Sequence, residues 1–178
     1  RLSSIETDEA IHALEWIGDT NQIMVASSST GISILDVEEG TLSRPVSSSS
    51  DVYSMAWNDT LGWLAFASRT ELLFWDMATR QRVLSLPLEV RPFRITDVAW
   101  SPDRTRIAAA LRDKIAIFTV ESAETVRPVI TLNSPAHPGM IISIDWLADN
   151  TVAGVSRGSR LAIWDITTGG EVFAMSLD

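Results

Sequence analysis

The sequence contains no cysteine and only two histidines, which narrows the chemistry open to it. Without cysteine there can be no disulfide, no thiolate metal ligand and no cysteine nucleophile. Neither a His-x-x-x-His motif nor a cluster of His, Asp and Glu at ligand spacing surrounds His12 or His137, so no zinc site is expected. Neither a glycine-rich phosphate loop nor a Gly-x-Ser-x-Gly motif occurs. We predict no catalytic residue, no metal and no cofactor; a dispersed Ser-His-Asp triad is the one enzymatic arrangement left open.

Positive charge and long apolar runs are also scarce. The sequence has 14 Lys and Arg residues and 23 Asp and Glu residues, which gives a formal net charge of −9. This balance argues against nucleic acid and anionic membranes as partners. No apolar run approaches the roughly 20 residues of a membrane-spanning helix. No leader peptide is recognisable, although Arg1 is not a natural start, and we expect a cytoplasmic protein.

What the sequence does contain is one unit that occurs four times. Each unit has a tryptophan closing an apolar run, and these tryptophans are 41, 43 and 46 residues apart: Trp16, Trp57, Trp100 and Trp146. A later apolar run closes 19 or 20 residues after the tryptophan, with Leu35-Asp36, Trp75-Asp76, Phe118-Thr119 and Trp164-Asp165. The runs are short and alternate in polarity, which is typical of β-strands. Repetition at this period indicates a propeller or solenoid.

Three segments carry a resemblance to a known family. Phe74-Trp75-Asp76, Ile163-Trp164-Asp165 and the turn Ser101-Pro102-Asp103 resemble the WD-repeat (WD40) β-propeller family, over nearly the whole chain. The resemblance implies an all-β fold, a WD40-like β-propeller segment of four four-stranded antiparallel blades. The expected blades are residues 11–46, 52–86, 95–132 and 141–178, after a leader or outer strand of a preceding blade at 1–10.

Four blades of this family make about half a ring. A half ring exposes apolar strand faces at both ends, and large apolar patches are rare on monomers. A second copy or a longer parent chain would complete the ring; a closed four-bladed ring is the third possibility. Six tryptophans are expected in the core by their repeat positions: Trp16, Trp57, Trp75, Trp100, Trp146 and Trp164. Trp63 has no counterpart in the other repeats and is the one considered for a partner contact.

The resemblance implies a non-catalytic scaffold or sensor platform for protein–protein interactions. One propeller face, built by the loops between blades and between second and third strands, is richer in arginine than in acids. Since arginine is common in binding hot spots, we expect an acidic protein segment to bind there. The expected binding residues are Arg69, Arg91, Arg94, Arg112, Arg157 and Arg160.

Two other interpretations compete with this one. Charged loops need no partner, so the arginine-rich face is also explained by ordinary solvation. The alternative function is a propeller enzyme or carbohydrate-binding module with its site in the central funnel. Its polar groups would be sought at Asp97, Ser143 and Asp145.

Overall fold

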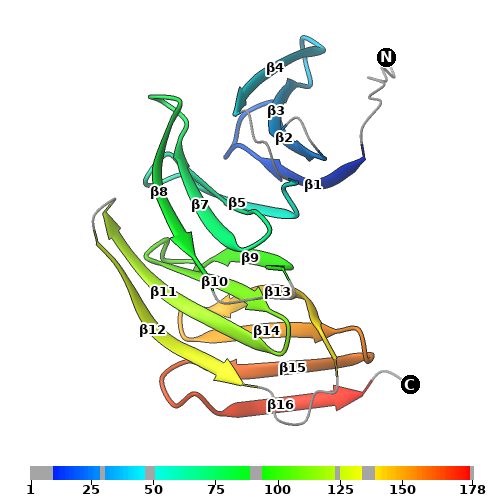
Figure 1. Cartoon of the computed structure of the whole chain (residues 1–178), viewed down its shortest axis with the longest axis vertical. Coiled ribbons are helices and arrows are strands. Elements are labelled where there is room, and N and C mark those ends of the chain that lie inside the picture. Colours follow the sequence, from blue (N-terminus) through cyan, green and yellow to red (C-terminus); the bar gives the residue numbers. More distant parts are fainter. Residues whose placement is uncertain are drawn as a thin grey trace.

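The computed structural model describes residues 10–28, 31–46, 51–88, 94–122, 125–133 and 139–176. These residues form four antiparallel sheets, each built from four strands that are consecutive in the chain. The sheets follow one another as blades along an open arc, from the N-terminal blade to the C-terminal blade (Figure 1). The predicted all-β, four-bladed WD40-like architecture is confirmed, and the closed four-bladed ring is wrong because the arc is open. Within the described ranges no helix is long and apolar enough to cross a membrane.

The strands are short and joined mainly by tight turns. Blade 1 contains β1 (Ile11–Trp16), β2 (Gln22–Ser27), β3 (Gly31–Asp36) and β4 (Thr41–Val46). Blade 2 contains β5 (Ser54–Asn58), β6 (Trp63–Ala67), β7 (Glu71–Asp76) and β8 (Gln81–Pro87). Blade 3 contains β9 (Asp97–Trp100), β10 (Arg106–Leu111), β11 (Lys114–Ser122) and β12 (Thr125–Asn133). Blade 4 contains β13 (Ile141–Ala148), β14 (Thr151–Ser156), β15 (Arg160–Asp165) and β16 (Glu171–Ser176). The expected leader at 1–10 lies, except for Ala10, outside the described residues.

The aspartate that ends the third strand closes the turn into the fourth. Asp76 Oδ1 accepts main-chain N–H bonds from Ala78 at 2.8 Å and Thr79 at 3.1 Å. The Thr79 N–H bond is the main reason that the pKa of Asp76 is lowered. Asp36 and Asp165 make the same pair of bonds in their own turns. Blade 3 has Thr119 at this position, and there β11 continues to Ser122 before the chain reverses.

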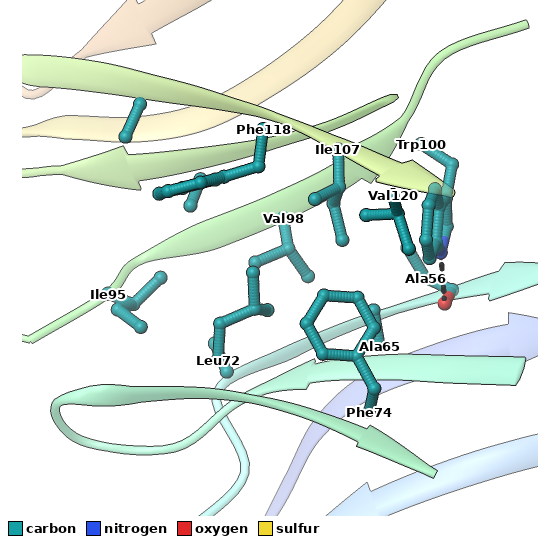
Figure 2. Packing of buried hydrophobic residues seen from close by; sticks show 13 residues of the cluster. Ala56, Ala65, Leu72, Phe74, Ile95, Val98, Trp100, Ile107, Phe118 and Val120 are labelled. Atoms are coloured by element: carbon teal, nitrogen blue, oxygen red, sulfur yellow. Dashed lines mark hydrogen bonds between the residues drawn. The ribbon is translucent and has the colours of Figure 1, made fainter. Parts of the chain in front are cut away.

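The hydrophobic core lies between the blades. Because neighbouring side chains in a strand point to opposite faces, each inner blade contributes to two clusters. In β10, Ile107 and Ala109 pack toward blade 2, whereas Ala108 and Ala110 pack toward blade 4. Figure 2 shows the cluster between blades 2 and 3, where Phe74 faces Trp100 edge-on at a ring-centroid distance of 5.9 Å. A third cluster joins blades 1 and 2.

The repeat tryptophans of blades 3 and 4 each connect their blade to the one before it. Trp100 Nε1 donates to the main-chain oxygen of Ala56 at 3.1 Å, drawn as the dashed line in Figure 2. Trp146 Nε1 donates in the same way to Ala99 at 3.0 Å. These side chains are only 6% and 7% exposed. The indole therefore joins hydrophobic burial to a hydrogen bond across the junction.

The expectation that all six column tryptophans are buried is wrong for Trp16. Trp16 is 56% exposed, because no blade precedes blade 1 among the described residues. Trp164 is buried, and Trp57 and Trp75 are half-buried against the cluster between blades 1 and 2. Trp63 is half-buried too, packed against the cluster between blades 2 and 3. Trp63 is thus chiefly a packing residue.

Candidate functional site

All four blades contribute to one pocket near the beginnings of their first strands. Its volume is about 220 Å³. The lining residues are His12, Tyr53, Arg94, Thr96, Met140, Ile142 and Arg157. The first strands of successive blades are neighbours in the arc, so residues about 40 positions apart in the chain meet here.

The pocket is built largely from one position of the repeat. His12, Tyr53, Thr96 and Ile142 each stand four residues before the repeat tryptophan of their blade. Arg94 and Met140 stand six residues before it in blades 3 and 4. Residues two apart in a strand or its extension point to the same side. The curved stacking of the blades therefore turns equivalent positions toward a common centre.

The aromatic part of the pocket holds an arginine in place. The Arg94 guanidinium carbon lies 4.1 Å from the centroid of the Tyr53 ring, a cation–π contact. The ring of His12 lies 5.7 Å from the Tyr53 ring, centroid to centroid. The Tyr53 hydroxyl donates a hydrogen bond to Asp51 Oδ2 at 3.0 Å. These contacts restrict Tyr53 and, through it, the Arg94 head group.

Arg157 enters the pocket from the turn between β14 and β15. Its main-chain N–H donates to the oxygen of Met140 at 2.9 Å, which fixes the turn against the start of blade 4. Within the described residues, neither Arg94 nor Arg157 forms an ion pair with a carboxylate. None of the described acidic side chains lines the pocket. The pocket is a positive site in an acidic protein.

The structure brings together two of the six arginines expected to bind a partner. Arg69 lies in the turn between β6 and β7, where its main-chain oxygen accepts the Ile95 N–H. Arg112 lies in the β10–β11 turn with a φ of 67°, and Arg160 pairs with Glu171 at 2.8 Å. Arg91 lies outside the described residues. Of the five arginines in this set that the structure describes, Arg94 and Arg157 line the pocket.

Sequence reasoning missed His12 and Tyr53 as pocket residues. His12 was considered only as a metal ligand or as the histidine of a catalytic triad, and Tyr53, the single tyrosine, was not considered. The sequence could have indicated them, because both stand four residues before the repeat tryptophan of their blade, at equivalent positions of the repeat. Among the described residues no group of three His, Asp or Glu side chains is placed to hold a metal ion. His137 is not among those residues.

Of the polar residues considered for a site in the central funnel, Asp97 and Ser143 form hydrogen bonds that join neighbouring blades. Asp97 Oδ1 accepts from Ser54 Oγ at 2.6 Å, and Oδ2 accepts from Ser143 Oγ at 3.0 Å and the Ile144 N–H at 2.8 Å. The carboxylate thus links blades 2, 3 and 4. Asp145 accepts the N–H of its own neighbour, Trp146, at 2.8 Å. Because both Asp97 oxygens hold blades together, the enzyme or sugar-binding alternative is not favoured.

Comparisons with known proteins agree with this architecture. The family model for the anaphase-promoting complex subunit 4 WD40 domain matches residues 1–60 and 55–150. Guanine nucleotide-binding protein subunit beta-1 of Drosophila melanogaster is 27% identical over 139 residues, covering 71% of this chain and 40% of that protein. The G(I)/G(S)/G(T) subunit beta-1 of Homarus americanus is 28% identical over 139 residues, with the same coverage of 71% and 40%.

A solved structure shares the fold over almost the full chain. The structure described as the mitotic checkpoint complex contains a chain that superposes with a TM-score of 0.79 at 18% identity, covering 98% of this chain and 53% of that chain. The present chain thus spans 40% of the length of these two relatives and about half of the solved chain. With four matching repeats, an open arc of four-stranded blades and a family model that covers most of its residues, the chain belongs to the WD40-repeat family, in the group described by the anaphase-promoting complex subunit 4 WD40 domain.

Proposed function

We propose that this chain is a non-catalytic platform for protein–protein interaction, and that its four-blade pocket binds an acidic side chain of a protein partner. The observation that carries the proposal is the convergence of Arg94 and Arg157, from different blades, in one pocket that no acidic side chain of the described part of the chain lines. Membership in the WD40-repeat family suggests a scaffold. The mitotic checkpoint complex, whose chain shares this fold, is by its description an assembly.

The pocket's chemistry suits a carboxylate. A guanidinium can offer two parallel N–H donors to a carboxylate, and such charge-assisted bonds are stronger than neutral ones. Contact with the Tyr53 ring limits the conformations of Arg94 before binding, which lowers the entropic cost of ordering it. The Thr96 hydroxyl is already used, since it donates to the oxygen of Ile141 at 2.7 Å. Arg94 and Arg157 therefore supply the recognition, and Tyr53 orients Arg94.

Both ends of the arc of blades are open (Figure 1). We propose that a second copy or further blades of a longer parent chain cover the two open ends, as in a complete propeller. The partner would bind at the pocket through loops held by strands, which is the usual division of labour in such scaffolds.

The test is a binding titration with a defined probe. A glutamate-rich octapeptide and its glutamine counterpart are titrated into the protein by isothermal calorimetry. The glutamate peptide should bind at least about tenfold more tightly, because charge-assisted bonds to guanidinium are lost with glutamine. The double variant R94E/R157E should abolish that preference, and added salt should weaken it in the wild type.

The matched control is Arg127→Glu. Arg127 is an exposed arginine on β12 that is not among the pocket residues. R127E changes the net charge by half as much as the double variant, so single R94E and R157E variants complete the set. Equal binding of both peptides, or equal losses in R127E and R94E, would overturn the assignment of the pocket.

A further inference from the structure

His12 stands at an irregularity of β1 that directs its side chain into the four-blade pocket. Ile11 and Ala13 pair with adjacent residues of β2, so His12 between them is an extra residue in the ladder. An extra residue of this kind, a β-bulge, bends its strand and redirects a side chain. The imidazole is exposed and lines the pocket.

The same irregularity occurs at the equivalent position of blade 4. Ile141 and Ser143 pair with adjacent residues of β14, and Ile142 between them is the extra residue. Like His12, Ile142 stands four residues before the repeat tryptophan and lines the pocket. The bulge therefore turns the same repeat position toward the pocket in both blades. Blade 4 presents a hydrocarbon side chain there, whereas blade 1 presents one that can gain a charge.

The strands packed beside His12 supply little opposing charge. β2 and β5 are the neighbours of β1, and neither carries a titratable side chain. On β1 itself the other titratable side chain is Glu15. Its carboxylate already accepts the main-chain N–H of Trp57 at 3.1 Å. The charge felt by the imidazole therefore comes mainly from the pocket.

Within the pocket, the groups around His12 are aromatic or positive. Its ring lies 5.7 Å from the Tyr53 ring, and the same Tyr53 ring holds the Arg94 guanidinium 4.1 Å from its centroid. Arg157 also lines the pocket. Asp51 accepts the Tyr53 hydroxyl and is not a lining residue. Protonated His12 is therefore a third positive charge in a pocket that no described carboxylate lines.

We propose that His12 makes the binding of an acidic side chain at this pocket depend on pH, with tighter binding when the imidazole is protonated. The inference rests on the proposed function of the pocket. Histidine is the side chain that ordinarily changes its charge between about pH 5 and 8. In the empty pocket an imidazolium and two guanidinium groups repel one another, and a bound carboxylate offsets that repulsion. Because linkage is reciprocal, the proton and the acidic ligand each strengthen the binding of the other.

Calorimetric titration at about pH 8 and about pH 6, at one ionic strength, measures the effect. The probes are the glutamate-rich octapeptide and its glutamine counterpart. Glutamate stays ionised at both values, since its ordinary pKa is about 4.3. The wild type should bind the glutamate peptide at least about threefold more tightly at the lower pH, as one added charge at close range predicts. The glutamine peptide should show no such gain.

The two pH values separate this inference from the proposed function. A preference for the glutamate peptide at pH 8 that does not grow at pH 6 would overturn the role of His12 and leave the pocket's function standing. Equal binding of the two peptides at both pH values would overturn both.

Three variants assign the effect to one residue. His12→Asn removes the titrating group, so the ratio of affinities at the two pH values should fall to about one, whatever its affinity at pH 8. His12→Lys is charged at both values and should bind more tightly than H12N at pH 8, without pH dependence. His137→Asn is the matched control, because His137 is the second of the two histidines. Retention of the ratio in H12N, or its loss in H137N, would show that the assignment is wrong.

Proton uptake gives an independent readout that a purely structural role of His12 would not change. Titrations of the glutamate peptide at about pH 7, in buffers with different enthalpies of ionisation, report the protons bound with the ligand. The wild type should take up a fraction of a proton for each peptide bound, and H12N should take up none. Equal uptake in the two proteins would contradict the proposal.

Discussion

Trp100 and Trp16 occupy the same position of the repeat and lie in opposite environments. Trp100 is 6% exposed and hydrogen-bonded to blade 2, whereas Trp16 is 56% exposed at the open end of blade 1. The two strands that carry them pair with their neighbours in the same way. The difference shows that the stabilising unit of this fold is the junction between blades, since one sheet alone cannot cover either of its faces.

The same contrast holds for the acidic residues of the first strands. Asp97, inside the arc, bonds to groups of three blades, whereas Asp145, on the open face of blade 4, accepts only from its neighbour Trp146 among the described residues. A buried junction thus recruits polar as well as apolar groups. Variants at paired positions can measure how much each junction contributes.

The largest effect should come from the tryptophans themselves. Trp100→Ala or Trp146→Ala should lower the free energy of unfolding by about 3–5 kcal/mol, the usual cost of deleting a large core side chain. Trp16→Ala should change it by less than about 0.5 kcal/mol at concentrations where the chain is monomeric. Trp63→Ala should fall between these values, because Trp63 is half-buried. Chemical denaturation measures all four, and equal losses at Trp16 and Trp100 would contradict the comparison.

A smaller loss of stability is expected when the Asp97 carboxylate, which links blades 2, 3 and 4, is removed. Asp97→Ala should cost about 1.5–3 kcal/mol, because it removes hydrogen bonds to a charged group and leaves their donors unsatisfied. Asp145→Ala is the control at the open face and should cost less than about 0.5 kcal/mol in the monomer. Urea unfolding of the two variants side by side gives the difference. A costlier loss at Asp145 than at Asp97 would show that the link between blades 2, 3 and 4 is not stabilising.

The smallest effect concerns acid stability in the turn between β9 and β10 of blade 3, where the partners of the Asp103 carboxylate lie. Partial burial raises the pKa of Asp103, but hydrogen bonds from Ser101, Thr105 and Arg106 outweigh it and bring the pKa to about 2, from an ordinary 3.8. A carboxyl with a lowered folded-state pKa stabilises the protein above its unfolded-state pKa and loses that contribution as pH falls. Stability should therefore decline between pH values of about 4 and 2.

The Asp103→Asn variant isolates this contribution. The asparagine side chain does not titrate, so the decline between about pH 4 and 2 should be shallower than in the wild type. Thermal unfolding across that range is the measurement. Superimposable pH profiles of the two proteins would show that Asp103 does not act through its charge.

Much of the fold followed from local patterns in the sequence. Alternating apolar residues predicted the strands, and the period of the tryptophans predicted four equivalent blades, because both depend only on residues close together in the chain. The aspartates that end the third strands, Asp36, Asp76 and Asp165, also act locally. Asp76 closes its turn with neighbours two and three residues away, and where Thr119 replaces it the hairpin is longer.

The site and the exposure of Trp16 could not be predicted in this way. His12, Tyr53, Arg94 and Arg157 come from four blades, and only the curvature of the stacked sheets brings them into one pocket. The six arginines were predicted as one face, yet Arg160 pairs with Glu171 and is not among the pocket residues, whereas Arg94 is. The repeat position of Trp16 predicts a side chain that is buried against a preceding blade. Whether a blade covers it depends on the next surface in space, because burial is a property of the assembled structure and not of the residue.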